Sequence, residues 1–183
     1  MTHQTNFFID KDKHSLDDLR TAYLFSCKKD IELIKPGNVN LLSSHKDTKA
    51  QDYLDSAILS SKELFNQNHS FGKRILESVK VTREQINVNT NLGIILLCAP
   101  VIQAYIDFNL LDLREGIKKT LATTSIKDTH DLCAAINVSS PGGLGDRDMY
   151  DTASYPNASI KEKIGRAHVR TPVTSLSRMP SSA

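Results

Sequence analysis

The sequence predicts an all-α protein, a bundle of several helices, and three observations support this prediction. Apolar residues recur at intervals of three and four from Ser15 to Ile136, which is the period of a helix with one buried face. No stretch alternates polar and apolar residues for long enough to form a convincing strand. The chain has 183 residues, of which 39% are hydrophobic and 24% charged, so it can bury the core of one ordinary globular domain.

The first predicted helix covers Ser15 to Ile34. Its apolar face is formed by Leu16, Leu19, Tyr23, Cys27, Ile31 and Ile34. Ser15 and Asp18 have the spacing of a capping box, in which each side chain satisfies a backbone N–H of the other residue. The helix should stop at Lys35-Pro36-Gly37-Asn38, because proline cannot continue a helix and glycine permits a left-handed turn. A polar loop follows.

Two further helices are predicted before residue 87. The first of them carries an apolar face made of Tyr53, Leu54, Ala57, Ile58, Ser61, Leu64 and Phe65. The next is shorter and carries Phe71, Ile75, Leu76 and Val79.

A fourth helix should begin near Asn91 and contain the longest apolar run, Leu92 to Ile102. This run is far shorter than the roughly 20 residues that span a bilayer, so we expect a buried helix and no membrane segment. Because it is apolar on all sides, it should be the central helix of the bundle, and Pro100 should kink it.

The fifth and sixth predicted helices are short. Asp112 and Glu115 cap the fifth, and Asp128 opens the sixth. The inward-facing residues are Leu113, Ile117 and Leu121 in the fifth helix and Leu132, Ala135 and Ile136 in the sixth.

Residues 164–183 differ from the rest of the chain. Apolar periodicity stops there, acids vanish, and serine, threonine, proline and arginine dominate. The segment resembles a translated sequencing adapter, so we predict a non-native disordered tail and a native part at 1–163. The tail contains three arginines, and removing them from the net charge of +2 leaves −1 for residues 1–163. This near-neutral body gives no reason to expect nucleic acid or a membrane as partner.

The three cysteines, Cys27, Cys98 and Cys133, lie far apart among apolar neighbours. We expect buried, reduced thiols in a cytoplasmic protein. No cysteine or histidine spacing indicates a zinc site, and the N-terminus has no charged-then-apolar leader.

Four polar clusters fall at predicted helix ends: residues 35–38, 87–91, 123–128 and 141–146. Backbone amides at helix starts bind anions, and nearby carboxylates can hold a magnesium ion. We hypothesise that the clusters meet at one end of the bundle and form a polyphosphate pocket. Taken singly, each cluster has a structural alternative: a helix stop, an N-cap at Asn91, Thr124 or Asp128, or a flexible glycine turn.

Taken in order, the clusters resemble a known family. KPGNV, an aspartate followed by Ser-Ala (Asp52, Ser56, Ala57), NTNLGIILLCAP, TTSIKDT and PGGLG resemble successive motifs of the triphosphoribosyl-dephospho-CoA synthase family. The resemblance covers about residues 20–152, and NTNLGI and PGGLG are its sharpest pieces. Members are considerably longer, so we expect a truncated bundle that lacks the C-terminal helices. Asn40 stands where many relatives have a histidine.

The resemblance implies an enzyme, a transferase that converts ATP and 3′-dephospho-CoA into 2′-(5″-triphosphoribosyl)-3′-dephospho-CoA and adenine. The product is the precursor of the prosthetic group on the acyl carrier subunit of citrate or malonate lyase-type enzymes. ATP is a substrate, and Mg²⁺ is the expected cofactor. The step should pass through an oxocarbenium-like state, as in glycoside hydrolysis.

The same resemblance implies roles for residues of the clusters. The residues expected to contact phosphate or ribose are Lys35, Asn38, Asn89, Asn91, Thr124, Gly142, Gly143 and Gly145. Asp52 and Asp128 are the expected catalytic residues, and Asp128 and Asp151 the expected magnesium ligands.

Two alternatives stay open: a related transferase with a different nucleotide or pterin-like acceptor, indicated by Asn40, and a non-catalytic helical scaffold whose motifs are only caps. A homo-oligomer also stays open. We expect the truncated chain to be inactive and poorly soluble, because the face of the apolar fourth helix would be exposed.

Overall fold

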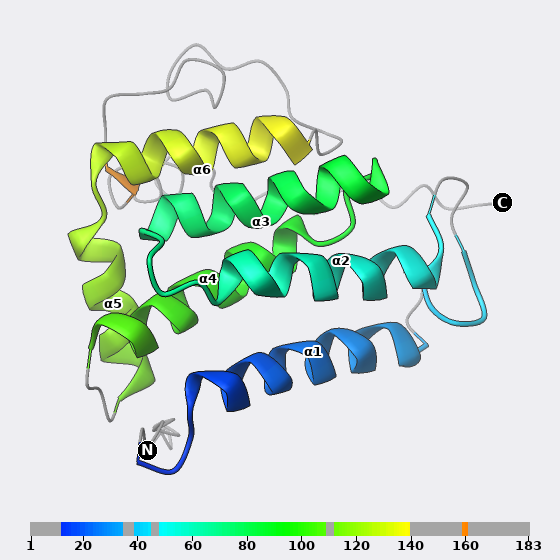
Figure 1. Ribbon diagram of the computed structural model, residues 1–183, viewed down its shortest axis with the longest axis horizontal. Coiled ribbons are helices and arrows are strands. Elements are labelled where there is room, and N and C mark those ends of the chain that lie inside the picture. Colours follow the sequence, from blue (N-terminus) through cyan, green and yellow to red (C-terminus); the bar gives the residue numbers. More distant parts are fainter. Residues whose placement is uncertain (1–11, 35–38, 45–47, 109–111, 140–158, 161–183) are drawn as a thin grey trace, which may run out of the picture.

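The computed structural model describes residues 12–34, 39–44, 48–108, 112–139 and 159–160. These residues form six helices and no strand, which confirms the predicted all-α class (Figure 1). The helices are α1 (Leu16–Glu32), α2 (Ala50–Leu64), α3 (Phe71–Ile86), α4 (Leu92–Asp107), α5 (Leu113–Thr123) and α6 (Ile126–Ser139). A β-bridge joins Asn40 and Ser43 within the short segment after α1.

The predicted capping box at the start of α1 is confirmed. The backbone N–H of Ser15 donates to the Asp18 carboxylate at 2.7 Å, and the N–H of Asp18 donates to Ser15 Oγ at 3.1 Å. Asp112 caps α5 as predicted, by accepting from the N–H of Arg114 at 2.8 Å. The prediction that Asp128 opens the last helix is wrong by two residues, because α6 begins at Ile126 and Asp128 lies within its first turn.

The central helix of the described bundle is α3 and not α4. Helix α3 packs against α2, α4 and α6, and eight of its residues are buried. Helix α4 has only five buried residues, and Leu97 keeps 74% of its surface exposed. The uniform hydrophobicity of α4 therefore did not predict its place, since helix position depends on the neighbours available and not on composition alone.

The direction of each helix defines two ends of the molecule (Figure 1). Arg74, near the start of α3, contacts Leu64 at the end of α2 and Gln103 near the end of α4, so α3 runs antiparallel to both helices. We call one end the Asn91 end: there α1, α3 and α6 finish and α2 and α4 begin. At the opposite end, the Asp128 end, α2, α4 and α5 finish and α3 and α6 begin.

The core joins apolar residues from five helices and from Ile160. Its most enclosed side chains include Leu64, Ile75, Ile95 and Ile160. Cys27 and Cys133 are buried, as expected, whereas Cys98 is half-buried, and none of the three forms a disulfide with another described residue. Burial raises the pKa of the Cys27 thiol to about 11, so this thiol stays protonated at neutral pH.

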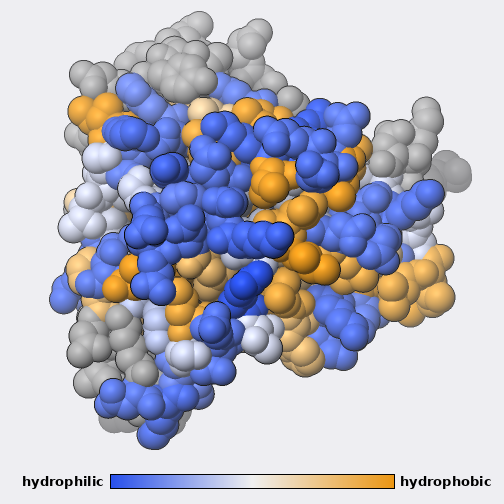
Figure 2. Space-filling view, in the orientation of Figure 1, coloured by the Kyte–Doolittle hydropathy of each residue, from blue (hydrophilic) through white to orange (hydrophobic). Residues whose placement is uncertain are grey.

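On the face that Figure 2 shows, hydrophilic residues cover much of the described surface, with apolar patches between them. Several large apolar side chains are nevertheless exposed at the Asn91 end, where α1 finishes: Leu33, Ile34, Leu41 and Leu42. No helix in the described ranges is both long enough and apolar enough to cross a membrane.

Candidate functional site

The Asn91 end contains a buried polar network centred on Asn91. The side chain of Asn91 is 6% exposed. Its Nδ2 donates to the backbone oxygen of Ser56 at 3.2 Å and to Ser60 Oγ at 3.2 Å, and its Oδ1 accepts from Thr82 Oγ1 at 3.5 Å. The amide therefore holds the start of α4 against α2 and α3, and its hydrogen-bonding capacity is largely used by the protein.

Two further contacts extend this network. The hydroxyls of Ser56 and Thr90 form a short hydrogen bond, and Ser56 Oγ also donates to the backbone oxygen of Asp52 at 2.6 Å. Ser60 Oγ lies 2.9 Å from the hydroxyl of Tyr23, whose pKa is raised chiefly by burial. The network thus joins α1, α2, α3 and the residues that enter α4.

The first turn of α4 is open at this end. The Asn91 side chain bonds none of the first-turn amides, so the N-cap residue does not satisfy them. The first turn contains no acidic residue. Gly93 is exposed, and a Cβ added there would meet no atom within 4 Å. An uncapped, unobstructed helix start with no negative charge is a favourable position for an anionic group.

Asp52 and Asn89 lie at the same end. Asp52 is in the first turn of α2, half-buried, and its Oδ2 accepts from the backbone N–H of Lys49 at 2.7 Å. One helical turn separates it from Ser56, which contacts Thr90. Asn89 is exposed just before α4. The structure therefore brings Asp52, Asn89 and Asn91 together.

The predicted site residues of the clusters 35–38 and 141–146, together with Asp151, lie outside the described residues: Lys35, Asn38, Gly142, Gly143, Gly145 and Asp151. The described segments next to them end at the Asn91 end. Leu41 donates its N–H to the backbone oxygen of Ile31 at 3.3 Å, beside the end of α1, and α6 ends there at Ser139.

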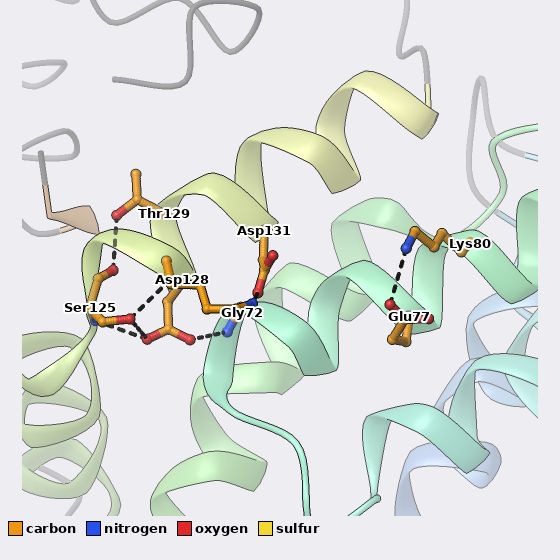
Figure 3. Close-up of polar contacts among 8 residues, drawn as sticks. Gly72, Glu77, Lys80, Ser125, Asp128, Thr129 and Asp131 are labelled. Carbon is orange, nitrogen blue, oxygen red and sulfur yellow. Dashed lines mark hydrogen bonds and ion pairs between the residues drawn. The ribbon is translucent and has the colours of Figure 1, made fainter. Parts of the chain in front are cut away.

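The Asp128 end has a different construction. Asp128 is 7% exposed, and both of its carboxylate oxygens accept hydrogen bonds (Figure 3). Oδ1 accepts from the N–H of Gly72 at 2.8 Å, while Oδ2 accepts from the N–H of Ser125 at 2.9 Å and from its hydroxyl at 2.7 Å. Burial alone would raise the pKa of Asp128, but the hydrogen bonds from Ser125 and Gly72 hold it below its ordinary value.

Thr124 lies beside Asp128 and ends α5. Its hydroxyl donates to the backbone oxygen of Leu121 at 2.9 Å. Both residues line a cavity of about 170 Å³ at this end. The other lining residues are Ser70, Phe71, Gln103, Asp107, Thr120 and Thr123.

The two ends are separated by most of the length of α3. Asp128 contacts Gly72 at the start of α3, and Asn91 contacts Thr82, ten residues later. At 1.5 Å per residue, these levels lie about 15 Å apart along the helix axis. The expectation that all four polar clusters meet at one end is therefore not met, because the cluster of residues 123–128 lies at the other end.

The family model of the ATP:dephospho-CoA triphosphoribosyl transferases (CitG) matches residues 16–175. The chain belongs to this family. No curated protein and no solved structure matches the chain. The CitG match reaches past residue 163 into the segment that resembles an adapter, and the domain boundary at 163 stays a prediction.

A resident magnesium site is not formed by the described residues of this CitG-family chain. They contain no group of three or more histidine, cysteine, aspartate or glutamate side chains able to hold a metal ion. The Asp128 carboxylate already accepts three hydrogen bonds, so it has little capacity left for a cation. The described residues therefore do not fit Mg²⁺ by themselves.

The sequence indicated Ser56 only as a motif residue, and its role and that of the other hydroxyls that support Asn91 were not predicted. Ser56 and Ser60 are spaced by four residues on the buried face of α2, and Ser78 and Thr82 repeat this spacing on α3. Hydroxyls at helical spacing on a face that is otherwise apolar could have revealed a polar seam between the two helices.

Proposed function

We propose that this protein transfers the 5-triphosphoribosyl group of ATP to 3′-dephospho-CoA and releases adenine, and that the reaction takes place at the Asn91 end. The product would serve as prosthetic-group precursor for citrate or malonate lyase-type acyl carrier subunits. The single observation that carries the placement is the open first turn of α4, which lies within the NTNLG motif of a family acting on ATP.

In this proposal the triphosphate binds at the start of α4. The first-turn amides would donate to phosphate oxygens, and the partial positive charge of the helix start would stabilise them. Gly93 favours this contact because it has no side chain to keep a phosphate away from the backbone. Asn91 acts as a positioning residue, since its amide fixes α4 against α2.

The chemistry requires a base on the acceptor side. The bond between the ribose C1′ of ATP and adenine breaks, and adenine takes the electron pair and one proton, which balances the proton lost by the acceptor. The 2′ oxygen of the acceptor ribose bonds to C1′ and gives up its proton. We propose Asp52 as the base that accepts this proton and as the negative charge that stabilises the oxocarbenium-like state. Its half-buried position at the Asn91 end supports this role.

The residues outside the described ranges complete the proposal. Lys35, Asn38, Gly142, Gly143 and Gly145 would contact phosphate or ribose, and Asn89 would do so from its exposed position before α4. Asp151 would meet the Mg²⁺ that accompanies ATP. Asp128 and Thr124 lie at the other end, so we propose that Asp128 supports the fold and does not contact ATP.

The departure of this chain from its relatives at Asn40 has a local use. Asn40 is 5% exposed, and its Oδ1 accepts from the N–H of Leu42 at 2.9 Å within the short bridge to Ser43. Because the side chain serves this turn, its identity does not favour a different acceptor.

Substitution of Gly93 tests the proposal. Gly93→Asp adds a negative charge in the first turn of α4, where an acid favours the helix and the Cβ has open space, so the melting temperature should stay the same or rise. ATP binding measured by calorimetry with Mg²⁺ should weaken at least tenfold, whereas the neutral Gly93→Asn should weaken it less than threefold. Equal ATP affinity in the wild type and Gly93→Asp would contradict the placement.

The reaction itself is tested by adenine release. The unaltered chain, supplied with ATP and Mg²⁺, should release adenine only when 3′-dephospho-CoA is added. Such release, measured under single-turnover conditions that detect a low rate, would contradict the expectation that the chain is inactive. Release that does not depend on 3′-dephospho-CoA would contradict the proposed acceptor.

A further inference from the structure

We propose that the cavity at the Asp128 end binds the ammonium group of a small primary amine, at a site separate from the proposed phosphate site. The cavity of about 170 Å³ lies between the ends of α4 and α5 and the starts of α3 and α6. The proposal does not rest on the transferase reaction. It rests on hydrogen-bonding capacity that the described residues leave unused.

Thr120 provides the first indication of a ligand. Its side chain is 1% exposed, and within the described part of the chain its hydroxyl has no hydrogen-bond partner although it lines the cavity. A buried polar group without a partner costs about 1–3 kcal/mol. A ligand in the cavity would supply the missing partner.

The other polar groups of the cavity are mainly acceptors. The single hydroxyl proton of Thr124 is used toward the oxygen of Leu121, and that of Thr123 toward the oxygens of Thr120 and Lys119 at 3.0 and 3.1 Å. Their hydroxyl oxygens can therefore only accept a further bond. Asp107 accepts from Gln103 Nε2 at 2.9 Å through each oxygen and keeps lone pairs for another donor.

The charge of the cavity excludes an anion. Two lining residues, Asp107 and Asp128, are acidic and none is basic. The nearest buried cation is Arg74, which lies behind Gln103 and donates to its Oε1 at 3.0 Å. One cation faces two carboxylates, and the C-terminal ends of α4 and α5 add partial negative charge. One amide at each of the two helix starts, that of Gly72 in α3 and that of Ser125 just before α6, already donates to Asp128.

An ammonium group matches these features. It carries three donors and a positive charge, so it can reach Thr120, Asp107 and a threonine hydroxyl at once. The ring of Phe71 lines the same cavity and can contact an alkyl stem or the cation itself. A bare metal ion fits less well, because no group of three or more metal-ligating side chains occurs among the described residues.

Calorimetry with 1,4-diaminobutane tests this site, with 1,4-butanediol as the uncharged probe of the same length. We expect the wild type to bind the diamine in the millimolar range or tighter and the diol at least tenfold more weakly. Thr120→Val removes only the unpartnered hydroxyl, so the melting temperature should stay the same or rise. The affinity for the diamine should fall at least threefold. Asp107→Asn should weaken diamine binding at least tenfold. Asp17→Asn removes the same charge at an exposed position of α1 and should not weaken it.

Three results would overturn the proposal. The first is no measurable diamine binding to the wild type. The second is an equal affinity of the wild type for the diamine and for the diol. An equal affinity of the wild type, Thr120→Val and Asp107→Asn for the diamine would count in the same way. The third is a loss of ATP affinity in the stable Thr120→Val variant, which would place the cavity in the nucleotide site.

Discussion

The backbone N–H of Gly72 donates a 2.8 Å hydrogen bond to Oδ1 of Asp128, and this contact joins the starts of α3 and α6. The other carboxylate oxygen of Asp128 accepts from Ser125 and closes the cap of α6. One buried carboxylate therefore satisfies orphan amides of two helices that run in the same direction. An aspartate that the family resemblance marks for catalysis has, in this structure, a complete set of structural partners.

Gly72→Ala should strongly destabilise the protein. A Cβ at this position would lie 2.4 Å from Cα and 2.5 Å from the backbone oxygen of Asp128, and backbone atoms cannot rotate away as a side chain can. We expect the free energy of unfolding, measured by urea denaturation, to fall by about 3 kcal/mol or more, at the upper end of overpacking costs.

Gly93→Ala is the matched control for that substitution. Gly93 also lies near a helix start, but a Cβ there would meet nothing within 4 Å. Alanine should leave the stability unchanged or raise it by up to about 1 kcal/mol. Equal destabilisation by both alanines would contradict the close approach of α3 and α6.

Asp128→Asn should destabilise the protein in a pH-dependent way. The asparagine side chain has an NH₂ group in place of one carboxylate oxygen. This group would face N–H or O–H donors of Gly72 or Ser125, which costs about 1–3 kcal/mol. The native pKa of Asp128 is lowered from its ordinary value of 3.8, so its stabilisation is present above that value and is lost as the pH falls through the native pKa.

The difference in unfolding free energy between wild type and Asp128→Asn should therefore be largest above about pH 5 and shrink below about pH 4. Asp18 also has a lowered pKa, but it is present in both proteins and cancels in the difference. Urea titrations at several pH values measure this. A difference that stays constant from pH 3 to pH 7 would show that the Asp128 charge does not stabilise the fold.

Much of the fold follows from the sequence because each helix carries its own periodicity and stop signals. Ser15 and Asp18 placed the start of α1, and Asp112 placed the start of α5, since capping depends on residues only two or three positions apart. The order of packing could not be read in this way. The buried centre is α3, although α4 is the more apolar helix, because packing depends on partners far away in the chain.

The candidate site shows the same division. Asp52, Asn89 and Asn91 do lie at one end, as the order of the motifs predicts for a shared pocket. Asp128 lies at the other end. Each helix carries the chain from one end of the bundle to the other, and the sequence does not say which loops share an end. A motif pattern gives residue types, but only the direction of each helix assigns them to one end or the other.

Asn91→Asp should destabilise the protein more than its small change in shape implies. A carboxylate at this position cannot donate to the backbone oxygen of Ser56 or to Ser60 Oγ, and at 6% exposure it would be charged away from water. We expect a loss of about 2–4 kcal/mol at pH 7. Part of this loss should be recovered near pH 5, where the protonated carboxyl can donate.

Asn89→Asp is the control for this prediction within the same motif. Asn89 is exposed, so its stability change should stay within about 0.5 kcal/mol. Chemical denaturation of both variants at pH 5 and pH 7 measures the contrast. Similar small effects at the two positions would mean that the polar network around Asn91 does not hold α4 in place.

Asp52→Asn should remove most of the transferase activity and leave ATP binding nearly intact. An asparagine can still accept from the N–H of Lys49 through its oxygen, so the start of α2 is preserved. It cannot take a proton from the acceptor hydroxyl, and loss of a general base lowers turnover by about 10²–10⁴-fold. Adenine release measures turnover, while calorimetry should find ATP affinity within threefold of the wild type.

Asp55→Asn, one turn away on α2 and paired with Gln51 at 2.8 Å, should change turnover less than twofold. Wild-type turnover in Asp52→Asn, or an equal loss in both variants, would remove Asp52 from the reaction.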